Sequence, residues 1–418
     1  MKFTGYRCSI CHKEYLPDQV IYTCPLDGGN LDVILDYSAI NKANPRKQIF
    51  ENRDHSLWRY LPLLPVSDPG ENDTSLRAVG GTPIFSPVLL SKTLGIKSLW
   101  IKDESHNPTA SFKDRASAVV VTRAREIKAD IVVTASTGNA GAALAGMSAA
   151  VGQKSVIFAP KTAPPAKVAQ LLIYGAKVLL VDGTYDDAFD LSIQASQEFG
   201  WYCRNTGYNP FTTEGKKTAA LEIWEWWEGL RHRYADKPLK VFIPVGDGNI
   251  ISGIHKGFKD LFKLGWLDSI PALFGVQSEG SAAIANAYHN GVETIIPVSA
   301  NTLADSISVD LPRDGVRAVR AAKESGGTYI LVSDKEILDA ISALGKVGIF
   351  AEPAGAAAYA GLVRACQTGL IQNDDPVLVI NTGNGLKDVK AAMQAAGAAK
   401  IIPPNLDSVR KEIGNTYG

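Results

Sequence analysis

The sequence predicts an α/β fold of parallel sheets with helices on both faces, divided into two or three domains. The chain has 418 residues, which is too long for one simple core. From about residue 82 onward, short β-rich runs alternate with longer helical stretches, and this alternation is typical of parallel sheets. Hydrophobic residues make up 45% and charged residues 21%, as in ordinary globular proteins.

The charge and composition exclude several classes of function. Lys+Arg and Asp+Glu both number 43, so the formal net charge is zero and no basic field exists to hold nucleic acid. No run approaches the roughly 18 apolar residues of a membrane span. The first residues lack the apolar stretch of a signal peptide, and five cysteines make no disulfide scaffold. We therefore expect a cytoplasmic protein with no membrane partner and no nucleic-acid partner.

The first 37 residues form a separate segment, rich in Cys, Gly and Pro. The pattern Cys8-x-x-Cys11 with Cys24-x-x-Asp27 resembles a zinc ribbon in which one ligand is changed. With Asp in the fourth place we expect a metal-free knuckle, and bound zinc is the alternative. A ribbon also leaves open a non-enzyme interpretation, a binding module, although the zero net charge argues against nucleic acid.

An arm at 38–66 and a polar loop at 67–74 lead into the main body. Eight runs are predicted as strands: Ser98–Lys102, Ile131–Thr134, Ser155–Ala159, Lys177–Val181, Lys240–Val245, Leu273–Val276, Tyr329–Val332 and Val377–Ile380. Seven stretches are predicted as helices: Ser111–Lys128, Ala140–Val151, Ala188–Phe199, Glu214–Tyr234, Ser252–Leu264, Asp334–Leu344 and Ala354–Thr368. In such folds, loops at the carboxyl ends of strands carry the chemistry.

The loop after the first of these strands contains a candidate catalytic lysine. A turn at 107–109 precedes a predicted helix start at Ser111, which places Lys113 in the first helical turn. The partial positive charge of a helix N-terminus makes this a poor position for a structural lysine. Together with burial it favours the neutral amine that a Schiff base requires. The alternative is a solvated lysine that pairs with Asp114 or Glu104.

The loop after the second strand is rich in small residues, with Ser136, Thr137, Gly138 and Asn139 ahead of a helix. Small residues let the backbone approach a ligand closely. Hydroxyl and N–H groups at a helix start suit a carboxylate, and the Asn139 amide can donate to a ring oxygen. The alternative is an ordinary capped turn.

Two further loops follow buried strands. The first consists of Gly246, Asp247, Gly248, Asn249 and Ile250 ahead of a helix. Successive N–H groups in such a turn form an anion cradle, although the spacing matches neither a Rossmann nor a Walker A loop. The second loop carries Thr382, whose hydroxyl can bond a pyridine nitrogen. For both loops the alternative is a glycine turn before a helix.

Together the four loops resemble those of fold type II pyridoxal 5′-phosphate (PLP) enzymes, and most closely the threonine synthases. The resemblance runs from about Gly80 to Lys390. The motifs that carry it are Gly81-Thr82-Pro83, Ser111-Phe112-Lys113-Asp114-Arg115, Ser136-Thr137-Gly138-Asn139, Asn209-Pro210-Phe211, Glu214-Gly215-Lys216-Lys217-Thr218, Phe350-Ala351-Glu352-Pro353-Ala354 and Thr382-Gly383-Asn384-Gly385-Leu386-Lys387-Asp388.

The resemblance implies two doubly wound domains after the zinc-ribbon-like segment 1–37. The large PLP-binding domain would take 38–104 and 236–418, and a small mobile domain would take 105–235. Homologous positions would have the following roles: Lys113 as Schiff-base lysine and proton shuttle, Asn139 at the ring hydroxyl, Gly246 to Ile250 at the phosphate, Thr382 at the pyridine nitrogen, and Ser136, Thr137 and Gly138 at the substrate carboxylate.

Five positions depart from the threonine synthase pattern: Ala116, Ala140, Gly207, Thr212 and Asn384. Thr212 stands where an arginine helps to bind the substrate phosphate, and threonine is a poor replacement. The resemblance implies conversion of phosphohomoserine to threonine and phosphate by a homodimer that binds a small amino acid. The alternatives within the fold are a β-replacement synthase, such as a cysteate synthase or sulfhydrylase, and a serine/threonine dehydratase.

Overall fold

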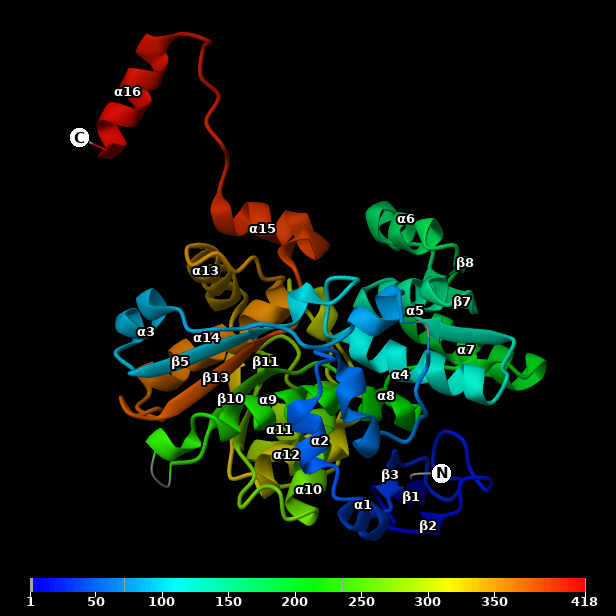
Figure 1. Cartoon of the computed structure of the whole chain (residues 1–418). Helices are drawn as coiled ribbons and strands as arrows, with labels where there is room; N and C mark the ends of the chain where they lie inside the picture. Colours follow the sequence, from blue (N-terminus) through cyan, green and yellow to red (C-terminus); the bar gives the residue numbers. More distant parts are fainter. Residues whose placement is uncertain (1–2, 71, 235–236, 418) are drawn as a thin grey trace.

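The computed structural model describes residues 3–70, 72–234 and 237–417, and Figure 1 shows their arrangement. Within these residues the strands form three sheets, with the orders β2-β1-β3, β12-β11-β10-β13-β5-β4 and β8-β7-β6-β9. No helix in the described ranges is both long and apolar enough to cross a bilayer.

The N-terminal segment is a small antiparallel sheet of β1 (Phe3–Cys8), β2 (Glu14–Tyr15) and β3 (Leu31–Leu35). Alternate residues of β3 are buried, as expected of a strand with one face on a core. Helices α1 (Tyr37–Ala43) and α2 (Arg46–Glu51), with 3₁₀ turns at Leu57–Leu63 and Ser75–Ala78, connect this sheet to the body.

The six-stranded sheet separates two cores. Its strands are β4 (Ile84–Phe85), β5 (Ser98–Asp103), β10 (Lys240–Pro244), β11 (Ala272–Ser278), β12 (Thr328–Val332) and β13 (Pro376–Asn381). All neighbours are parallel except β4, which is antiparallel to β5. Along β10, Val241 and Ile243 belong to one core and Phe242 to the other, because successive side chains of a strand point to opposite faces.

Helices cover both faces of this sheet. They are α3 (Val88–Leu94), α10 (Asn249–Lys263), α11 (Ala283–His289), α12 (Gly315–Glu324), α13 (Asp334–Gly345), α14 (Pro353–Gln367) and α15 (Val389–Ala396). In Figure 1, α13 and α14 lie on one side of the sheet and α10 to α12 on the other. Helix α16 (Leu406–Tyr417) projects from the body.

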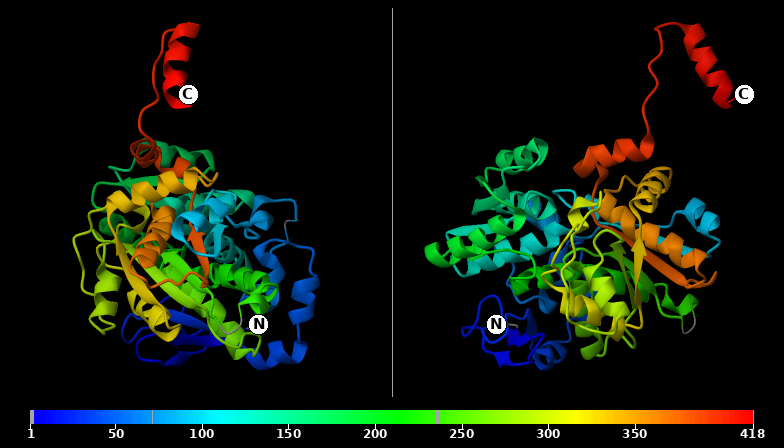
Figure 2. Two further views of the ribbon diagram at one scale, coloured as in Figure 1. Left: turned by 90° about the vertical axis from the view of Figure 1, so that its left-hand side faces the viewer. Right: turned by 180° about the vertical axis from the view of Figure 1, so that it is seen from behind.

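The four-stranded sheet forms a second layered unit, visible beside the first in Figure 2. It contains β6 (Ile131–Ala135), β7 (Lys154–Pro160), β8 (Lys177–Val181) and β9 (Tyr202–Cys203), all parallel. Its helices are α4 (Lys113–Glu126), α5 (Asn139–Ala150), α6 (Pro165–Ile173) and α7 (Tyr185–Phe199). Helices α8 (Pro210–Lys216) and α9 (Thr218–Glu228) lead back to the large sheet.

The predicted α/β class is confirmed, and every predicted strand is present within a few residues. Strands β4 and β9 were not predicted, because two-residue strands leave almost no alternation to detect. The prediction of one helix at Glu214–Tyr234 is wrong: the chain interrupts it at Lys217, where the Thr218 hydroxyl bonds the Gly215 carbonyl at 2.7 Å, and α9 ends before Gly229.

The domain boundaries stay a prediction. The four-stranded sheet draws all its strands from 131–203, and the six-stranded sheet draws its strands from 84–103 and 240–381. The predicted boundary between residues 235 and 236 lies outside the described residues, as do residues 1, 2 and 418.

Candidate active site

Lys113 is the first residue of α4, and the loop before it packs on the loop that contains Thr382. The Phe112 N–H donates to the Thr382 carbonyl at 2.8 Å, and the Asn384 N–H donates to the Ala110 carbonyl at 3.1 Å. These loops are far apart in sequence but follow neighbouring strands β5 and β13. Because the strands are parallel, their carboxyl ends bring both loops to one edge of the sheet.

The start of α4 is held by its own acidic residue. The buried Asp114 carboxylate accepts from the Thr109 N–H at 2.6 Å and also from the Thr109 hydroxyl. Burial raises the pKa of Asp114 to about 6, although the Thr109 bonds work in the opposite direction. Between Thr109 and Asp114, Ala110 adopts a left-handed φ of 64°, which is unusual for a residue with a side chain. The loop therefore has one well-defined path into the helix.

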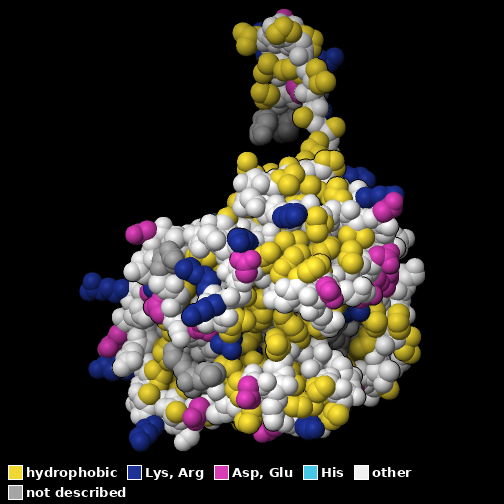
Figure 3. Space-filling view, turned by 90° about the vertical axis from the view of Figure 1, so that its right-hand side faces the viewer, with side chains coloured by type: hydrophobic (Ala, Val, Ile, Leu, Met, Phe, Trp, Pro, Cys, Tyr) yellow, Lys and Arg dark blue, Asp and Glu magenta, His cyan; other side chains and the backbone are white. Residues whose placement is uncertain are grey.

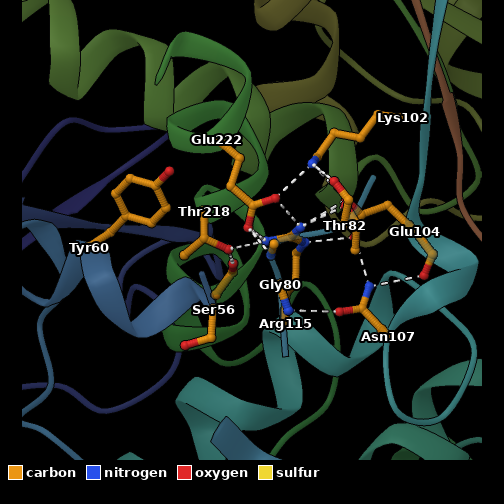
Figure 4. Close-up of polar contacts among 12 residues, drawn as sticks. Ser56, Tyr60, Gly80, Thr82, Lys102, Glu104, Asn107, Arg115, Thr218 and Glu222 are labelled. Carbon is orange, nitrogen blue, oxygen red and sulfur yellow. Dashed lines mark hydrogen bonds and ion pairs between the residues drawn. The ribbon is translucent and has the colours of Figure 1, made fainter. Parts of the chain in front are cut away.

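Two residues after Lys113, Arg115 is the centre of a buried ionic cluster (Figure 4). Its Nε and Nη2 donate to the Glu104 carboxylate at 2.7 and 2.9 Å. Its Nη1 and Nη2 donate to the Glu222 carboxylate at 2.6 and 2.8 Å. Lys102 Nζ adds a 2.6 Å bond to Glu222. Two cations and two anions therefore satisfy one another away from water, and such mutual pairing is what makes buried charge tolerable.

The predicted cofactor residues other than Asn139 line one cavity. Lys113, Thr382 and the whole loop from Gly246 to Ile250 contribute to its wall. The wall also includes Thr206, Lys216, Ser306, Ile307, Glu352 and Ala354. The structure therefore brings together the lysine, the glycine loop and the threonine that the sequence suggested separately.

The glycine loop has a backbone path that other residues would not allow. A Cβ at Gly246 would lie 2.8 Å from Ile307 Cα, and a Cβ at Gly248 would lie 2.7 Å from the Asp314 carbonyl oxygen. Gly248 also has a left-handed φ of 88°, which favours glycine. It caps α10 without any side-chain hydrogen bond, so the first-turn N–H groups remain for an anion in the cavity.

The side chains of this loop make contacts that hold it in place. Asn249 accepts from Lys216 Nζ at 2.5 Å and donates to Asp314 at 2.6 Å. Asp247 accepts from the Arg313 N–H at 3.3 Å. Burial raises the pKa of Asp247, against the lowering effect of this hydrogen bond and of nearby cations.

The electrostatics of the cavity favour a neutral amine on Lys113. Burial lowers the pKa of Lys113; Glu352 acts in the opposite direction, and Arg204 lowers it further. The pKa of Lys216 is held well below its usual range by burial and by Lys113 and Arg204. A lysine with a depressed pKa is able to act as a nucleophile or a base near neutral pH.

A second hollow adjoins the first and carries most of the predicted substrate loop. Thr137, Gly138 and Asn139 line it together with Lys167 and Lys387. Glu352, Ser306 and Ala354 line both spaces. Ser136 lines neither of the two; its hydroxyl accepts from the Gly138 N–H at 3.2 Å and so stabilises the turn.

Glu352 is a site residue that the sequence prediction did not include. Its two carboxylate oxygens each lie 2.9 Å from Asn139 Nδ2, and burial raises its pKa. A Cβ at Gly383 would lie 2.4 Å from Glu352 Oε1, so a larger residue there would have to displace this carboxylate. The signal was present in the motif Phe350-Ala351-Glu352-Pro353-Ala354, which places a carboxylate directly before a helix.

Arg204 was also missed, because no motif contains it. It is fully buried, and its Nη1 donates to the Thr206 hydroxyl at 2.7 Å and its Nε to Ser117 at 3.2 Å. Its Nη2 has no hydrogen-bond partner among the described residues. Burial lowers the pKa of Arg204 to about 10, with Tyr185 working in the opposite direction, so the group is cationic at neutral pH.

Thr212, which stands where an arginine was expected, does not offer its hydroxyl as a donor to the cavity. The buried hydroxyl donates to the Asn209 carbonyl at 2.7 Å. Arg204 therefore brings a guanidinium to this region from a different position in the chain.

Comparison with known proteins identifies the family. Residues 76–383 match the family described as pyridoxal-phosphate dependent enzyme. A threonine synthase from Methanocaldococcus jannaschii is 41% identical over 393 residues, which cover 93% of this chain and 94% of that protein. A threonine synthase from Methanosarcina acetivorans is 39% identical over 410 residues, which cover 97% of this chain and 98% of that protein.

Solved structures agree on the fold. A threonine deaminase from Solanum lycopersicum superposes with a TM-score of 0.64 at 25% identity and covers 83% of this chain and 95% of that one. A maize serine racemase superposes with a TM-score of 0.64 at 22% identity and covers 81% and 94%. The predicted cofactor, PLP, and the resemblance to threonine synthases are confirmed, and a binding module without enzymatic activity is ruled out. The chain belongs to the family of pyridoxal-phosphate dependent enzymes, as a lyase-type relative of the threonine synthases that carries out elimination or replacement on amino acids.

Proposed function

We propose that the chain converts O-phosphohomoserine and water into threonine and phosphate. The observation that carries this proposal is the buried guanidinium of Arg204, which has an unpaired Nη2 and lies close enough to Lys113 to lower the pKa of that amine. A phosphorylated substrate needs such a cation, because charge-assisted bonds from guanidinium to phosphate are strong and directional. The high identity to threonine synthases over almost the whole chain supports the same reaction.

The residues around the cavity fit the cofactor. An amine with a depressed pKa, an anion cradle at the start of α10 and a hydroxyl at Thr382 line one space, and they match in turn the aldehyde, phosphate and pyridine nitrogen of PLP. When bound, PLP supplies an electron sink for negative charge that develops on the amino acid. Lys113 would attach the cofactor, and Asn139 would face its ring hydroxyl from beside Glu352.

The chain's own groups account for the remaining tasks. The Lys113 amine, once released, accepts and returns protons at the substrate carbons, which its lowered pKa favours. Thr137 and Gly138 bind the substrate carboxylate beside Lys167 and Lys387, and Ser136 supports this turn. Arg204 neutralises the negative charge of the departing phosphate. A preorganised cation in a buried site stabilises such developing charge without reorganisation.

A product assay with the purified, PLP-loaded enzyme tests this function. With O-phosphohomoserine alone, we expect phosphate and threonine to appear in equal amounts. The Lys113→Ala variant should lose the visible absorption of the attached cofactor and activity by at least about a thousandfold. Retention of both by this variant would contradict the role given to Lys113.

A second candidate function is favoured by Thr212, which replaces the arginine expected at the substrate phosphate. It is β-replacement on O-phosphoserine or a related substrate, or deamination of serine or threonine. The same preparation is therefore supplied with O-phosphoserine plus sulfite, with serine and with threonine. Turnover of one of these, without threonine formation from O-phosphohomoserine, would replace the first proposal with the second.

The assembly and location of the enzyme are also proposals. We infer a homodimer, because apolar side chains lie on the projecting C-terminal segment and gather on the body below it (Figure 3). Ile401 is 99% exposed and Leu406 is 69% exposed, and exposed apolar groups of this kind are typical of surfaces that associate. A small amino acid is the expected substrate, and the cytoplasm is the expected compartment, because free cysteines suit a reducing environment.

A further inference from the structure

Four side chains of the N-terminal sheet converge outside the active site. Cys8, Cys11, Cys24 and Asp27 each offer one ligand atom, and these atoms all lie within 4.8 Å of one another. Cys8 and Cys24 are buried, whereas Cys11 and Asp27 face solvent. The cluster therefore sits at the surface of the sheet, where an ion can enter from one side.

Two of the separations between these atoms match a tetrahedral metal site. Cys11 Sγ lies 3.7 Å from Cys24 Sγ, and Cys8 Sγ lies 3.3 Å from Asp27 Oδ1. A zinc ion with bonds of about 2.3 Å to sulfur and about 2.0 Å to oxygen would place two sulfurs about 3.8 Å apart and a sulfur and oxygen about 3.5 Å apart. These two pairs of ligand atoms thus stand close to the spacing that zinc requires, and all four atoms lie within 4.8 Å of one another.

The surrounding groups orient the four side chains. The Ile10 N–H donates to Cys8 Sγ at 3.3 Å, the Tyr15 hydroxyl lies 3.1 Å from Cys24 Sγ, and the Gly29 N–H donates to Asp27 Oδ1 at 2.9 Å. Such outer contacts hold metal ligands in place. A Cβ at Gly29 would lie 2.7 Å from Cys8 Sγ, so the backbone at Gly29 packs directly against the cluster.

The loops that carry these ligands also contact segments beside the active-site cavity. In the sequence, Tyr22 lies between the first ligand pair and the second. Its hydroxyl accepts from the Cys203 N–H at 2.9 Å, and its ring stacks on that of Tyr208 with 4.6 Å between the ring centroids. Asn30 Nδ2 donates to the Gly207 carbonyl, and at 3.0 Å to the Arg313 carbonyl. The segment 203–208 includes Thr206, which lines the cavity, and Arg204, which lowers the pKa of Lys113.

We propose that Cys8, Cys11, Cys24 and Asp27 bind one zinc ion, and that the metal holds segments 203–208 and 313–314 in position beside the active site. Three thiolates and one carboxylate form a tetrahedral, mostly soft donor set, which suits zinc. Asp27 replaces a fourth cysteine without loss of charge. The sequence pattern favoured a metal-free knuckle, and the placement of the four side chains favours the alternative.

Metal analysis of the full-length, PLP-loaded enzyme tests the site. We expect about one zinc per chain, with three sulfur neighbours at about 2.3 Å in zinc-edge X-ray absorption. Cys11→Ser should lower the zinc content at least about tenfold, and Asp27→Cys should keep one zinc with four sulfur neighbours. Cys366→Ser is the matched control, because this cysteine lies on α14 outside the cluster, and it should keep full zinc.

Hydrogen exchange tests the link to the active site. In Cys11→Ser, peptides that cover 203–208 and 313–314 should exchange faster than in the wild type, while the buried strand β11 should be unchanged. Asp27→Cys, which remains loaded, should match the wild type throughout.

Several outcomes would overturn the proposal. A protein with no zinc, with iron in its place, or with a Cys11–Cys24 disulfide would exclude the site. Full zinc retention by Cys11→Ser would exclude this ligand set. Loss of zinc with unchanged exchange at 203–208 would exclude the positioning role.

Discussion

Arg204 is an example of a charge buried without a carboxylate partner. Its guanidinium is fully buried, bonds only to hydroxyl groups and leaves Nη2 unpaired among the described residues. Burial of a charge without full pairing costs free energy. The unpaired Nη2 therefore supports the proposal that an anionic substrate completes the bonding of Arg204.

Replacement of Arg204 by glutamine should weaken substrate binding without loss of the cofactor. Removal of a hydrogen bond to a charged group costs about 1.5–3 kcal/mol, so the KM for O-phosphohomoserine should rise about tenfold to a hundredfold. Steady-state kinetics and the visible absorption of the bound cofactor are the two measurements. Arg231→Gln, at an exposed ion pair, is the control. An unchanged KM, or a variant that no longer binds PLP, would contradict this role.

At the scale of elements, the ionic cluster around Arg115 connects three segments that carry the site. Lys102 belongs to β5, Arg115 to α4 and Glu222 to α9, and all three are buried. Because Lys113 precedes Arg115 by two residues, the cluster sets the position at which α4 begins. A fully paired cluster in a low-dielectric region is rigid, and loss of one partner leaves an uncompensated charge.

Glu222→Gln should destabilise the protein by about 3–5 kcal/mol at pH 7. Burial alone would raise the pKa of Glu222, but Arg115 and Lys102 outweigh it and lower the pKa from 4.5 to about 2. The stabilisation from this carboxylate is therefore present above pH 4.5 and is lost as the pH falls through about 2. As the pH falls from 4.5 to about 2, the free energy of unfolding should therefore decrease less in Glu222→Gln than in the wild type.

Denaturant unfolding at pH 7 and at acidic pH checks this expectation. Glu51→Gln is the matched control, because its 3.7 Å pair with Lys47 is exposed, and its effect should stay below about 0.5 kcal/mol. Equal losses in the two variants would show that the buried cluster contributes no more than a surface pair.

At the scale of the whole molecule, helix α16 stands apart from the rest of the chain. It follows an extended segment after α15 and projects from the body in every view (Figures 1 and 2). A helix of this length gains most of its stability from the burial of an apolar face. Its exposed Leu406 and Ile413 thus point to contacts with a second copy of the chain.

Removal of residues 400–418 should therefore weaken the proposed dimer. We expect the full chain to sediment as a dimer and the truncated chain to dissociate at least about tenfold more readily, because buried apolar surface contributes about 25 cal/mol per Å². Sedimentation equilibrium across a concentration series measures this difference. A wild-type monomer, or a truncated chain of unchanged affinity, would remove α16 from the interface.

The sequence by itself determined the fold class, the cofactor and much of the site. Alternation of strand and helix patterns is local, so the parallel strands and the loops after them could be located without tertiary contacts. Lys113, the glycine loop at Gly246 and Thr382 follow such strands, and the structure gathers all of them at one cavity. Their roles in catalysis stay predictions.

Only the tertiary structure decided which distant groups meet. Asn139 contacts Glu352 across 213 positions, and Arg204, which belongs to none of the motifs, comes close enough to Lys113 to lower the pKa of that amine. Neither periodicity nor motif spacing reports such contacts, because they arise when separate elements pack and bury one another's polar groups. Burial also sets the pKa of Lys113 and the unpaired charge of Arg204, and burial is a property of the folded chain alone.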